Sequence, residues 1–502
     1  MKRMTFAATA ALAMTFVMTF AKTANAQWLS NPNQAADGSQ AANAWGNPSQ
    51  NPWAVFNLTI TDLDGTPIEG AEVMIGEDAN IPFYGNVLTT DHDGHVAIPQ
   101  TWRDPQPVTI TAQGFVKATY LSLAPGIQTL KVRRASESIV SSSRFELKGN
   151  SSGFGNLKND GVFDLGLVVQ AIPRAQISTM SLQSLISPET DHFTVLGQSV
   201  DLPSNITIPD QTESYYFPLH FAKPTYRLYL PQNGAWQIAA LHARVPFKAT
   251  IDALQSGKSM IDIINSFDFR EGSITPVNLT QNSTTLDLAV NQTQYVKNLK
   301  FTAPAYDASL NLLTISLANS NGSYYPTDIK NATPGATVQM SAPANSQDGM
   351  ILAAFRKANA KATGAEVDQY SAVTLPNSEQ RPFDPLRLVN PPQANADQLV
   401  LDTPTAPTEL TPVMTYGVFS MVTLVTQGHL QMETKQPLWD VWAPSWVQKL
   451  DLPKQTPPTP GANQKLRWEV GFDAQFTGQT RVPPGPDALE KITHVTRSAV
   501  DL

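Results

Sequence analysis

The feature that most limits the fold is a series of short alternating segments, separated by turn sequences, that begins near residue 55. Val55 to Thr61 and Val108 to Ala112 alternate apolar and polar residues with a period of two, the pattern of a strand with one buried face. Asp62-Leu63-Asp64-Gly65 and Asp91-His92-Asp93-Gly94 have the composition of tight turns, because Asp accepts local backbone hydrogen bonds and Gly permits positive φ. About six such strands predict a small β-sandwich over residues 55–133.

The same unit carries a family pattern. Gly65-Thr66-Pro67-Ile68-Glu69-Gly70-Ala71-Glu72-Val73 fits the order Gly-x-Pro-x-x-Gly-Ala-x-Val, and Thr90-Asp91-x-x-Gly94 and then Val108 to Phe115 follow it. The unit therefore resembles the carboxypeptidase regulatory-like domain, a transthyretin-like sandwich that is also grouped with starch-binding-like folds. The resemblance covers residues 55–133 of 502 and implies an accessory module of exported proteins without peptidase activity of its own.

The first 26 residues have the pattern of an export signal. Lys2 and Arg3 precede an apolar run from Phe6 to Phe20, and Ala24-Asn25-Ala26 supplies the small-x-small cleavage pattern. The apolar run is shorter than the about 20 residues that a spanning helix needs, so we interpret residues 1–26 as a signal peptide. Because no later stretch approaches spanning length, we expect no transmembrane segment after it.

Composition narrows the class of protein. The chain contains no cysteine, which excludes disulfides, thiol nucleophiles and thiolate metal sites. Exported eukaryotic proteins of this size normally use disulfides, so we expect a bacterial protein that is periplasmic, exposed on the outer surface or secreted. A low charged fraction of 15% and 39 prolines are typical of extracellular β-domains. The net charge of −8, without clustered Lys and Arg, argues against nucleic acid as a partner.

Shifts in composition suggest the domain plan. Residues 27–54 are rich in small polar residues and predict a flexible mature N-terminus, and a Ser-rich stretch at 134–143 predicts a linker. Residues 144–304 predict a β-rich unit with a helix near 249–267, where apolar residues recur at about 3.6 spacing. Residues 305–502 predict a C-terminal β-sandwich-like unit with proline-rich connections. We therefore expect a mainly β fold of serial Ig-like or transthyretin-like sandwiches, with one or two short helices in the middle unit.

One turn segment also holds potential metal ligands. Asp91, His92, Asp93 and His95 place two carboxylates and two imidazoles close together, a set that suits a divalent cation. The same residues are explained by a turn with both histidines in water, and we favour that interpretation. Asp62 to Gly65 lacks the further oxygen ligand and bidentate Glu of an EF-type calcium loop, so it also predicts a turn. We expect no cofactor.

Aromatic residues form the candidate ligand-binding group. Trp439, Trp442 and Trp446 would line one side of a helical turn, and Tyr215-Tyr216 is a second cluster. Such rings can stack on sugars, but Pro444 interrupts the helical spacing. We therefore favour a packed loop or hydrophobic plug over a carbohydrate platform.

Motifs of catalysis are missing from the chain. It has no HExxH zinc helix, no Gly-x-Ser-x-Gly nucleophile turn and no glycine-rich phosphate loop after a strand. A glycosidase pair such as Asp191 and Glu213 stays open, because its two carboxylates need to be close only in space. We therefore predict no catalytic residue.

The leading hypothesis is an exported, non-enzymatic β-protein of the bacterial envelope or surface that acts in binding or adhesion, with carbohydrate or another envelope protein as partner. The alternative is a hydrolase of extracellular or envelope polymer with its site in 144–304. A pocket there that holds two carboxylates, or His with carboxylates, would favour the hydrolase. A third possibility is a structural component of a surface assembly, marked by an unpaired sheet edge or a groove for a donor strand.

Overall fold

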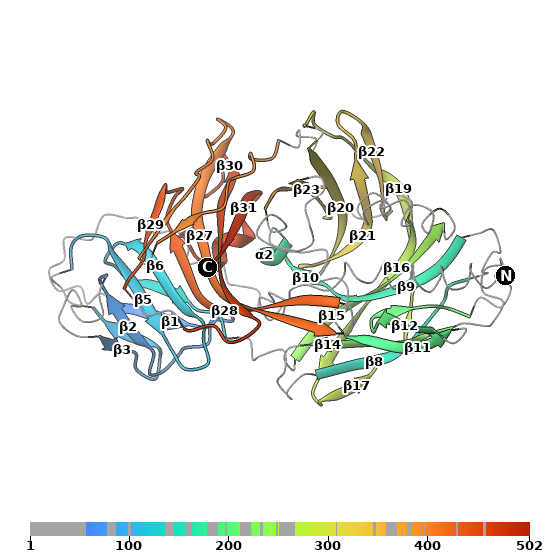
Figure 1. Cartoon of the computed structure of the whole chain (residues 1–502), viewed down its shortest axis with the longest axis horizontal. Coiled ribbons are helices and arrows are strands. Elements are labelled where there is room, and N and C mark those ends of the chain that lie inside the picture. Colours follow the sequence, from blue (N-terminus) through green and yellow to red (C-terminus); the bar gives the residue numbers. More distant parts are fainter. Residues whose placement is uncertain are drawn as a thin grey trace.

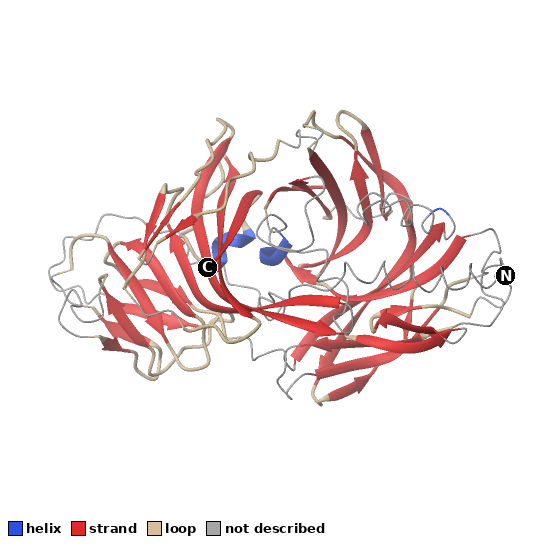
Figure 2. Ribbon diagram, viewed as in Figure 1, coloured by secondary structure: helices blue, strands red, loops and turns tan. Residues whose placement is uncertain are grey.

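The structure is a computed structural model, and within the residues that it describes the regular secondary structure is almost entirely β-strand (Figure 2). The mainly β fold class is therefore confirmed. The expected signal peptide and flexible N-terminus lie outside the described residues, as do most of the expected linker at 134–143 and of the expected helix near 249–267. The described residues are 57–77, 87–98, 102–135, 145–155, 162–177, 189–195, 198–210, 222–230, 234–246, 249, 267–307, 309–344, 348–357, 369–378, 384–395, 397–427, 430–454 and 458–502.

The first unit is a two-sheet sandwich. Its strands are β1 (Asn57–Thr61), β2 (Glu72–Ile75), β3 (Leu88–Thr89), β4 (His95–Ala97), β5 (Gln106–Thr111), β6 (Lys117–Leu123) and β7 (Gln128–Lys131). One sheet has the order β4-β1-β7, and β6-β5-β2-β3 belongs to the other. Leu58 and Leu130 of the first sheet pack with Val73, Ile110 and Tyr120 of the second in one core. The apolar positions of the alternating segments therefore lie in the core between the two sheets, as a sandwich requires.

A long sheet runs through both halves of the molecule and includes the second sheet of the first unit (Figure 1). Its further strands are β10 (Ile172–Pro173), β20 (Leu310–Ser320), β21 (Ser323–Ala332), β23 (Met350–Lys357), β24 (Tyr370–Pro376), β27 (Leu410–Gln427), β28 (Leu430–Ala443), β30 (Gln464–Phe476) and β31 (His494–Asp501). Among the described residues it has 13 strands in the order β10-β21-β20-β23-β24-β31-β30-β27-β28-β6-β5-β2-β3. The parallel pairing of β6 with β28 builds the first unit into the C-terminal sheet.

Two further sheets complete the half of the molecule drawn on the right in Figure 1. One has the order β13-β9-β15-β16-β19-β22, from β9 (Val162–Gln170), β13 (Ile206–Thr207), β15 (Gly234–Pro246), β16 (Asp268–Leu279), β19 (Thr293–Thr302) and β22 (Thr337–Pro343). The other contains β8 (Phe145–Ser152), β14 (Thr225–Leu230), β17 (Ser283–Thr285) and β18 (Leu288–Ala289). A separate pair is formed by β11 (Thr190–Val195) and β12 (Gln198–Pro203).

Strands β9 and β15 of the six-stranded sheet are buried on both faces. Val168 and Ile238 face the core shared with β8 and β14, whereas Val169 and Leu241 face the core shared with the long sheet. Strands covered on both faces are expected to be continuously apolar, which accounts for the run Leu165 to Val169.

Short elements cover the middle of the long sheet. The helices α2 (Arg174–Ile177) and η3 (Pro486–Glu490) pack against each other between the two halves (Figure 2). Helix α2 is a short helix within the middle unit, while most of the helix expected near 249–267 lies outside the described residues. A small sheet joins β25 (Gln393–Ala394), β26 (Gln398–Val400) and β29 (Lys449–Asp451). Neither described helix has the length and apolar character to cross a membrane.

Candidate functional site

The segment Asp91 to His95 forms a turn. Asp91 Oδ1 accepts hydrogen bonds from the backbone N–H of Asp93 at 3.0 Å and of His95 at 2.8 Å. Gly94 has φ of 70°, and a Cβ there would lie 2.5 Å from the carbonyl oxygen of Ile60. The exposed ring of His92 lies 3.4 Å from Glu69. Among the described residues, no three His, Asp or Glu side chains form a group suited to a metal.

Asp62 is also a turn residue. Its Oδ1 accepts from the N–H of Asp64 at 3.0 Å and of Thr66 at 2.9 Å, and its Oδ2 accepts from Arg134 Nη2 at 2.8 Å. The carboxylate is buried, and its two oxygens bond to the backbone of the turn and to the guanidinium of Arg134. This geometry agrees with the turn interpretation of the Asp62–Gly65 segment.

Two of the three candidate tryptophans belong to a strand, where residues three apart point to opposite faces. Trp439 and Trp442 lie on β28 in two different cores and are 3% and 1% exposed. Trp439 donates to Thr119 Oγ1 at 2.8 Å, and Trp442 stacks on Tyr416 with 3.9 Å between ring centroids. Trp446 is half-buried and donates to a backbone carbonyl on β30. The structure therefore packs these rings and does not group them as a platform, while Tyr215, Tyr216 and Glu213 lie outside the described residues.

Strands β9, β15 and β16 bring a histidine and two carboxylates together inside the 144–304 unit. His242 Nε2 lies 2.8 Å from Asp164 Oδ1, and His242 Nδ1 lies 2.9 Å from Glu271 Oε1. All three residues are at most 8% exposed. Arg244 Nε donates to Asp164 Oδ1 at 3.2 Å, and Gln294 donates to the other oxygen of Glu271. We call these five residues the His242 cluster.

The contacts of His242 differ from those of a catalytic base. A catalytic imidazole uses one ring nitrogen for an orienting carboxylate and keeps the other for the proton that it transfers. Both ring nitrogens of His242 face carboxylates, and Phe154 packs edge-on to the ring with 5.2 Å between centroids. This arrangement suits the joining of three strands better than chemistry on a substrate.

Two ionisable residues of this cluster interrupt apolar strands, and this is the sequence signal that points to it. Asp164 interrupts the apolar run Phe163 to Val169, and His242 interrupts the apolar strand around Leu241. An ionisable side chain inside an apolar strand needs a buried partner, because an unpaired buried charge is strongly unfavourable. The partner could not be identified, since Glu271 lies on another strand.

Asp191, a candidate carboxylate from the sequence, is a counter-ion. Its Oδ2 lies 2.9 Å from Lys223 Nζ, and Arg227 pairs with its Oδ1. Lys223 is buried and also donates to the backbone carbonyls of Ser204, Ile206 and Thr225. Burial lowers the pKa of Lys223, and the Asp191 carboxylate opposes that change.

A buried ion pair connects the first unit to the C-terminal strands. Arg133 Nε and Nη2 donate to the two carboxylate oxygens of Asp440 on β28 at 2.6 and 2.5 Å. The side chains are 6% and 3% exposed, and Tyr416 O–H donates to Asp440 at 3.1 Å. A two-point contact of this kind holds one orientation. The first unit is therefore held to β28 by side chains as well as by the pairing of β6.

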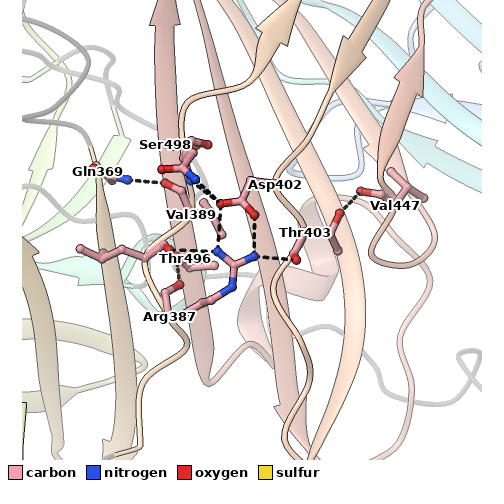
Figure 3. Close-up of polar contacts among 10 residues, drawn as sticks. Gln369, Arg387, Val389, Asp402, Thr403, Val447, Thr496 and Ser498 are labelled. Atoms are coloured by element: carbon pink, nitrogen blue, oxygen red, sulfur yellow. Dashed lines mark hydrogen bonds and ion pairs between the residues drawn. The ribbon is translucent and has the colours of Figure 1, made fainter.

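A proline-rich segment, residues 384–395 and 397–409, packs against β31 (Figure 3). Thr496 and Ser498 of β31 each donate to a backbone carbonyl of the segment at 2.9 Å. Arg387 donates to both oxygens of Asp402 at 2.9 and 2.6 Å, which ties two parts of the segment together. The hydrogen bonds from Arg387 lower the pKa of Asp402 to about 2. This segment agrees with the proline-rich connections expected in the third unit.

The strands β27 and β28 form a hairpin that is longer than its neighbours. The pairing of β27 with β30 ends at Thr423, whereas β27 pairs with β28 as far as Gln427 and Leu430. On the other side, β28 pairs with β6 from Trp439 to Trp442. In the part of the chain that the structure describes, the backbone at 424–427 and 430–438 therefore has strand pairing on one side. We call these residues the hairpin arm, which runs out of the left half of Figure 1 in orange.

Comparisons with known proteins give no family. No family model matches the chain, and no curated protein gives a significant match. The TIE protein of Bacillus anthracis matches at a TM-score of 0.15 and 10% identity, over 65% of this chain and 49% of its own, so this chain spans about half of its length. The major pilin subunit of Bacillus cereus matches at a TM-score of 0.15 and 11% identity, over 64% and 95%. A Streptococcal ancillary pilin matches at 0.13 and 7%, over 76% and 98%. Likenesses this distant carry no argument.

Proposed function

We propose that the protein is an exported, non-enzymatic β-sandwich protein that acts by binding at the bacterial envelope or surface. The hairpin arm carries this proposal. Open strand edges accept further strands, and protein–protein recognition often uses them in this way. The order of charge, apolar run and small residues at 1–26 supports export. The sequence resemblance of residues 55–133 to the carboxypeptidase regulatory-like domain supports the proposal that this unit is an accessory module.

We infer that the partner is another envelope protein that offers an extended segment. A strand edge recognises backbone N–H and C=O groups, which proteins present and polysaccharides do not. A sugar platform needs exposed ring faces, and Trp439 and Trp442 are buried. These observations favour a protein partner over carbohydrate.

The hydrolase alternative receives less support from the same unit. Its chemistry would fall on Asp164, His242 and Glu271, which are buried. Their geometry uses both ring nitrogens of the histidine in pairing. The binding proposal needs no such group.

A binding experiment with residues 27–502 tests the proposal. Labelled protein is sedimented with isolated envelopes of the source bacterium, before and after the envelopes are treated with trypsin. The variant lacks 424–433 and joins Thr423 to Thr434 through Asn-Gly, a sequence that favours a tight hairpin turn. The control is Ile127→Ser, which changes a side chain that is 77% exposed in a turn outside the arm.

We expect binding that trypsin abolishes and that the shortened arm weakens by about tenfold or more, a loss of about 1.4 kcal/mol. Ile127→Ser should bind like the native chain. Equal binding of the native and shortened chains would refute the role of the arm. Absence of binding to envelopes would refute the proposed function.

A further inference from the structure

Asp473 is a buried carboxylate between the two apolar cores of the long sheet. It lies on β30, is 0% exposed, and neither of its oxygens has a hydrogen-bond partner among the described residues. Its neighbours on the adjacent strands are Met414 of β27 and Val495 of β31. Met414 belongs to the core of the first unit, and Val495 belongs to the core of the other half. We call this meeting point, together with the contact of α2 with η3, the seam.

Arg497 is the cation that faces Asp473. It pairs with Gly471 on β30, two residues before Asp473, so both side chains lie on the same face of the sheet. A Cβ on Gly471 would lie 3.1 Å from Cγ and Nε of Arg497, so the glycine makes room for the arginine to cross the strand. The guanidinium carbon lies 5.6 Å from the ring centroid of Tyr416.

The two charged groups attract each other without direct contact. Nε and Nη2 of Arg497 are buried and, within the described residues, have no hydrogen-bond partner. No ion pair joins Arg497 to Asp473 in that part of the chain, although the arginine opposes the effect of burial on the carboxyl. A buried carboxylate without hydrogen bonds is strongly unfavourable, whereas its protonated form is not.

The groups around this pair come from several elements. Burial raises the pKa of Asp473 to about 6, and Arg497 opposes the rise. Arg497 interacts electrostatically with Tyr370 of β24, Tyr416 of β27 and Glu469 of β30. Glu469 in turn interacts with Lys435 of β28. The helices at the seam contribute Arg174 of α2 and Glu490 of η3.

We propose that protonation of Asp473 is a switch that sets how firmly the two halves of the molecule are held together at the seam. The protonated side chain is neutral and fits between the two cores. Loss of the proton leaves a negative charge on Asp473, between the apolar side chains of Met414 and Val495. Arg497 reaches the first unit through Tyr416, Asp440 and Arg133, whose contacts follow one another.

The sign of the effect follows from linkage. The native pKa of about 6 lies above the unfolded value of about 3.9. The contribution of Asp473 to stability is therefore complete below pH of about 4 and is lost as the pH rises through about 6. The seam should be firmest in mildly acidic solution. This inference does not depend on the hairpin arm.

The experiment compares residues 27–502 with the variant Asp473→Asn, which mimics the protonated carboxyl. Thermal unfolding is measured from pH 5 to pH 8, and the difference between the two chains removes the titration of every other group. We expect Asn to raise Tm by at least about 2 °C at pH 8 and by about half as much at pH 5. The control Asp402→Asn should give a constant difference over this range, because the pKa of Asp402 is about 2.

Hydrogen exchange of peptides that cover α2 and η3 tests the location. Exchange at the seam, corrected for its intrinsic pH dependence, should increase from pH 5 to pH 8 in the native chain and not in Asp473→Asn. Parallel Tm profiles for the two chains would refute the switch, and unchanged exchange at the seam would refute its location. If the variant does not fold, the proposal is tested by an NMR titration of the Asp473 carboxyl in the native chain. A titration midpoint below pH 4.5 would refute the proposal.

Discussion

The His242 cluster and the seam are both buried and charged, but they differ in how completely their charges are paired. In the cluster, hydrogen bonds reach both ring nitrogens of His242, one oxygen of Asp164 and both oxygens of Glu271. At the seam, Asp473 and Arg497 keep unpartnered atoms within the described residues. Paired buried charges hold strands in one arrangement. In contrast, burial without hydrogen bonds raises the pKa of a carboxyl, so that it can gain or lose a proton near neutral pH. The cluster is therefore expected to be structural and the seam to respond to pH.

The largest effect is expected from removing the centre of the cluster. His242→Ala leaves Asp164 and Glu271 buried without their shared partner, and breaking such a pairing costs about 3–5 kcal/mol. Urea unfolding of the mature chain measures the loss. A loss below about 1 kcal/mol would mean that the cluster is not structural, and the comparison with the seam would fail.

The ion pair between the first unit and β28 should give the next largest effect. Asp440→Leu alone leaves Arg133 as an unpaired buried charge, and we expect a loss of about 3 kcal/mol. The double variant Arg133→Met with Asp440→Leu removes both charges and should recover a large part of that loss. Urea unfolding of both single variants and the double variant completes the cycle. Additive effects would show that the pair does not act as a unit.

A methyl group at Gly471 tests how tightly the seam is packed. Gly471→Ala places a Cβ 3.1 Å from Arg497, so the arginine must move, and we expect a loss of about 1–2 kcal/mol. Gly417→Ala is a matched control on β27, because its Cβ would meet other atoms at 3.4 Å or more. Thermal unfolding compares the two variants. Equal effects would indicate that Arg497 does not depend on the space over Gly471.

The smallest effect is expected at the exposed pair of Arg387 and Asp402. The pKa of Asp402 is lowered to about 2, below its unfolded value of about 3.9. Its contribution is therefore present above pH of about 4 and lost as the pH falls through about 2. Because the pair is partly exposed, Asp402→Asn should cost less than about 1 kcal/mol at pH 7 and nothing at pH 2. Chemical unfolding at both pH values measures this, and an equal loss at pH 2 would contradict the assignment.

Local features of the first unit could be predicted because they depend on neighbouring residues. Asp91 and Gly94 form their turn through hydrogen bonds that span a few residues. The alternation of Val108 to Ala112 identifies a strand with one buried face in the same way. In contrast, the spacing of Trp439 and Trp442 suggested one side of a helical turn, whereas the strand places the rings on opposite faces.

The paired and unpaired charges could not be predicted, because their members meet across strands far apart in the sequence. Asp164, His242 and Glu271 come from three strands, and no motif spacing joins them. Asp473 and Arg497 are closer in sequence, yet their lack of partners depends on the cores on either side. The hairpin arm likewise depends on where β6 and β30 stop pairing.

The sequence by itself determined the mainly β class, the strands and turns of residues 57–131, and the low charge that suits packed sheets. These properties follow from hydrophobic periodicity and local hydrogen bonding, which act over a few residues. The tertiary structure alone decided that the first unit shares a sheet with β28, that His242 is fully paired and that Asp473 is not. Strand pairing and burial are long-range properties, so the pairing of a charge is known only when every element around it is in place.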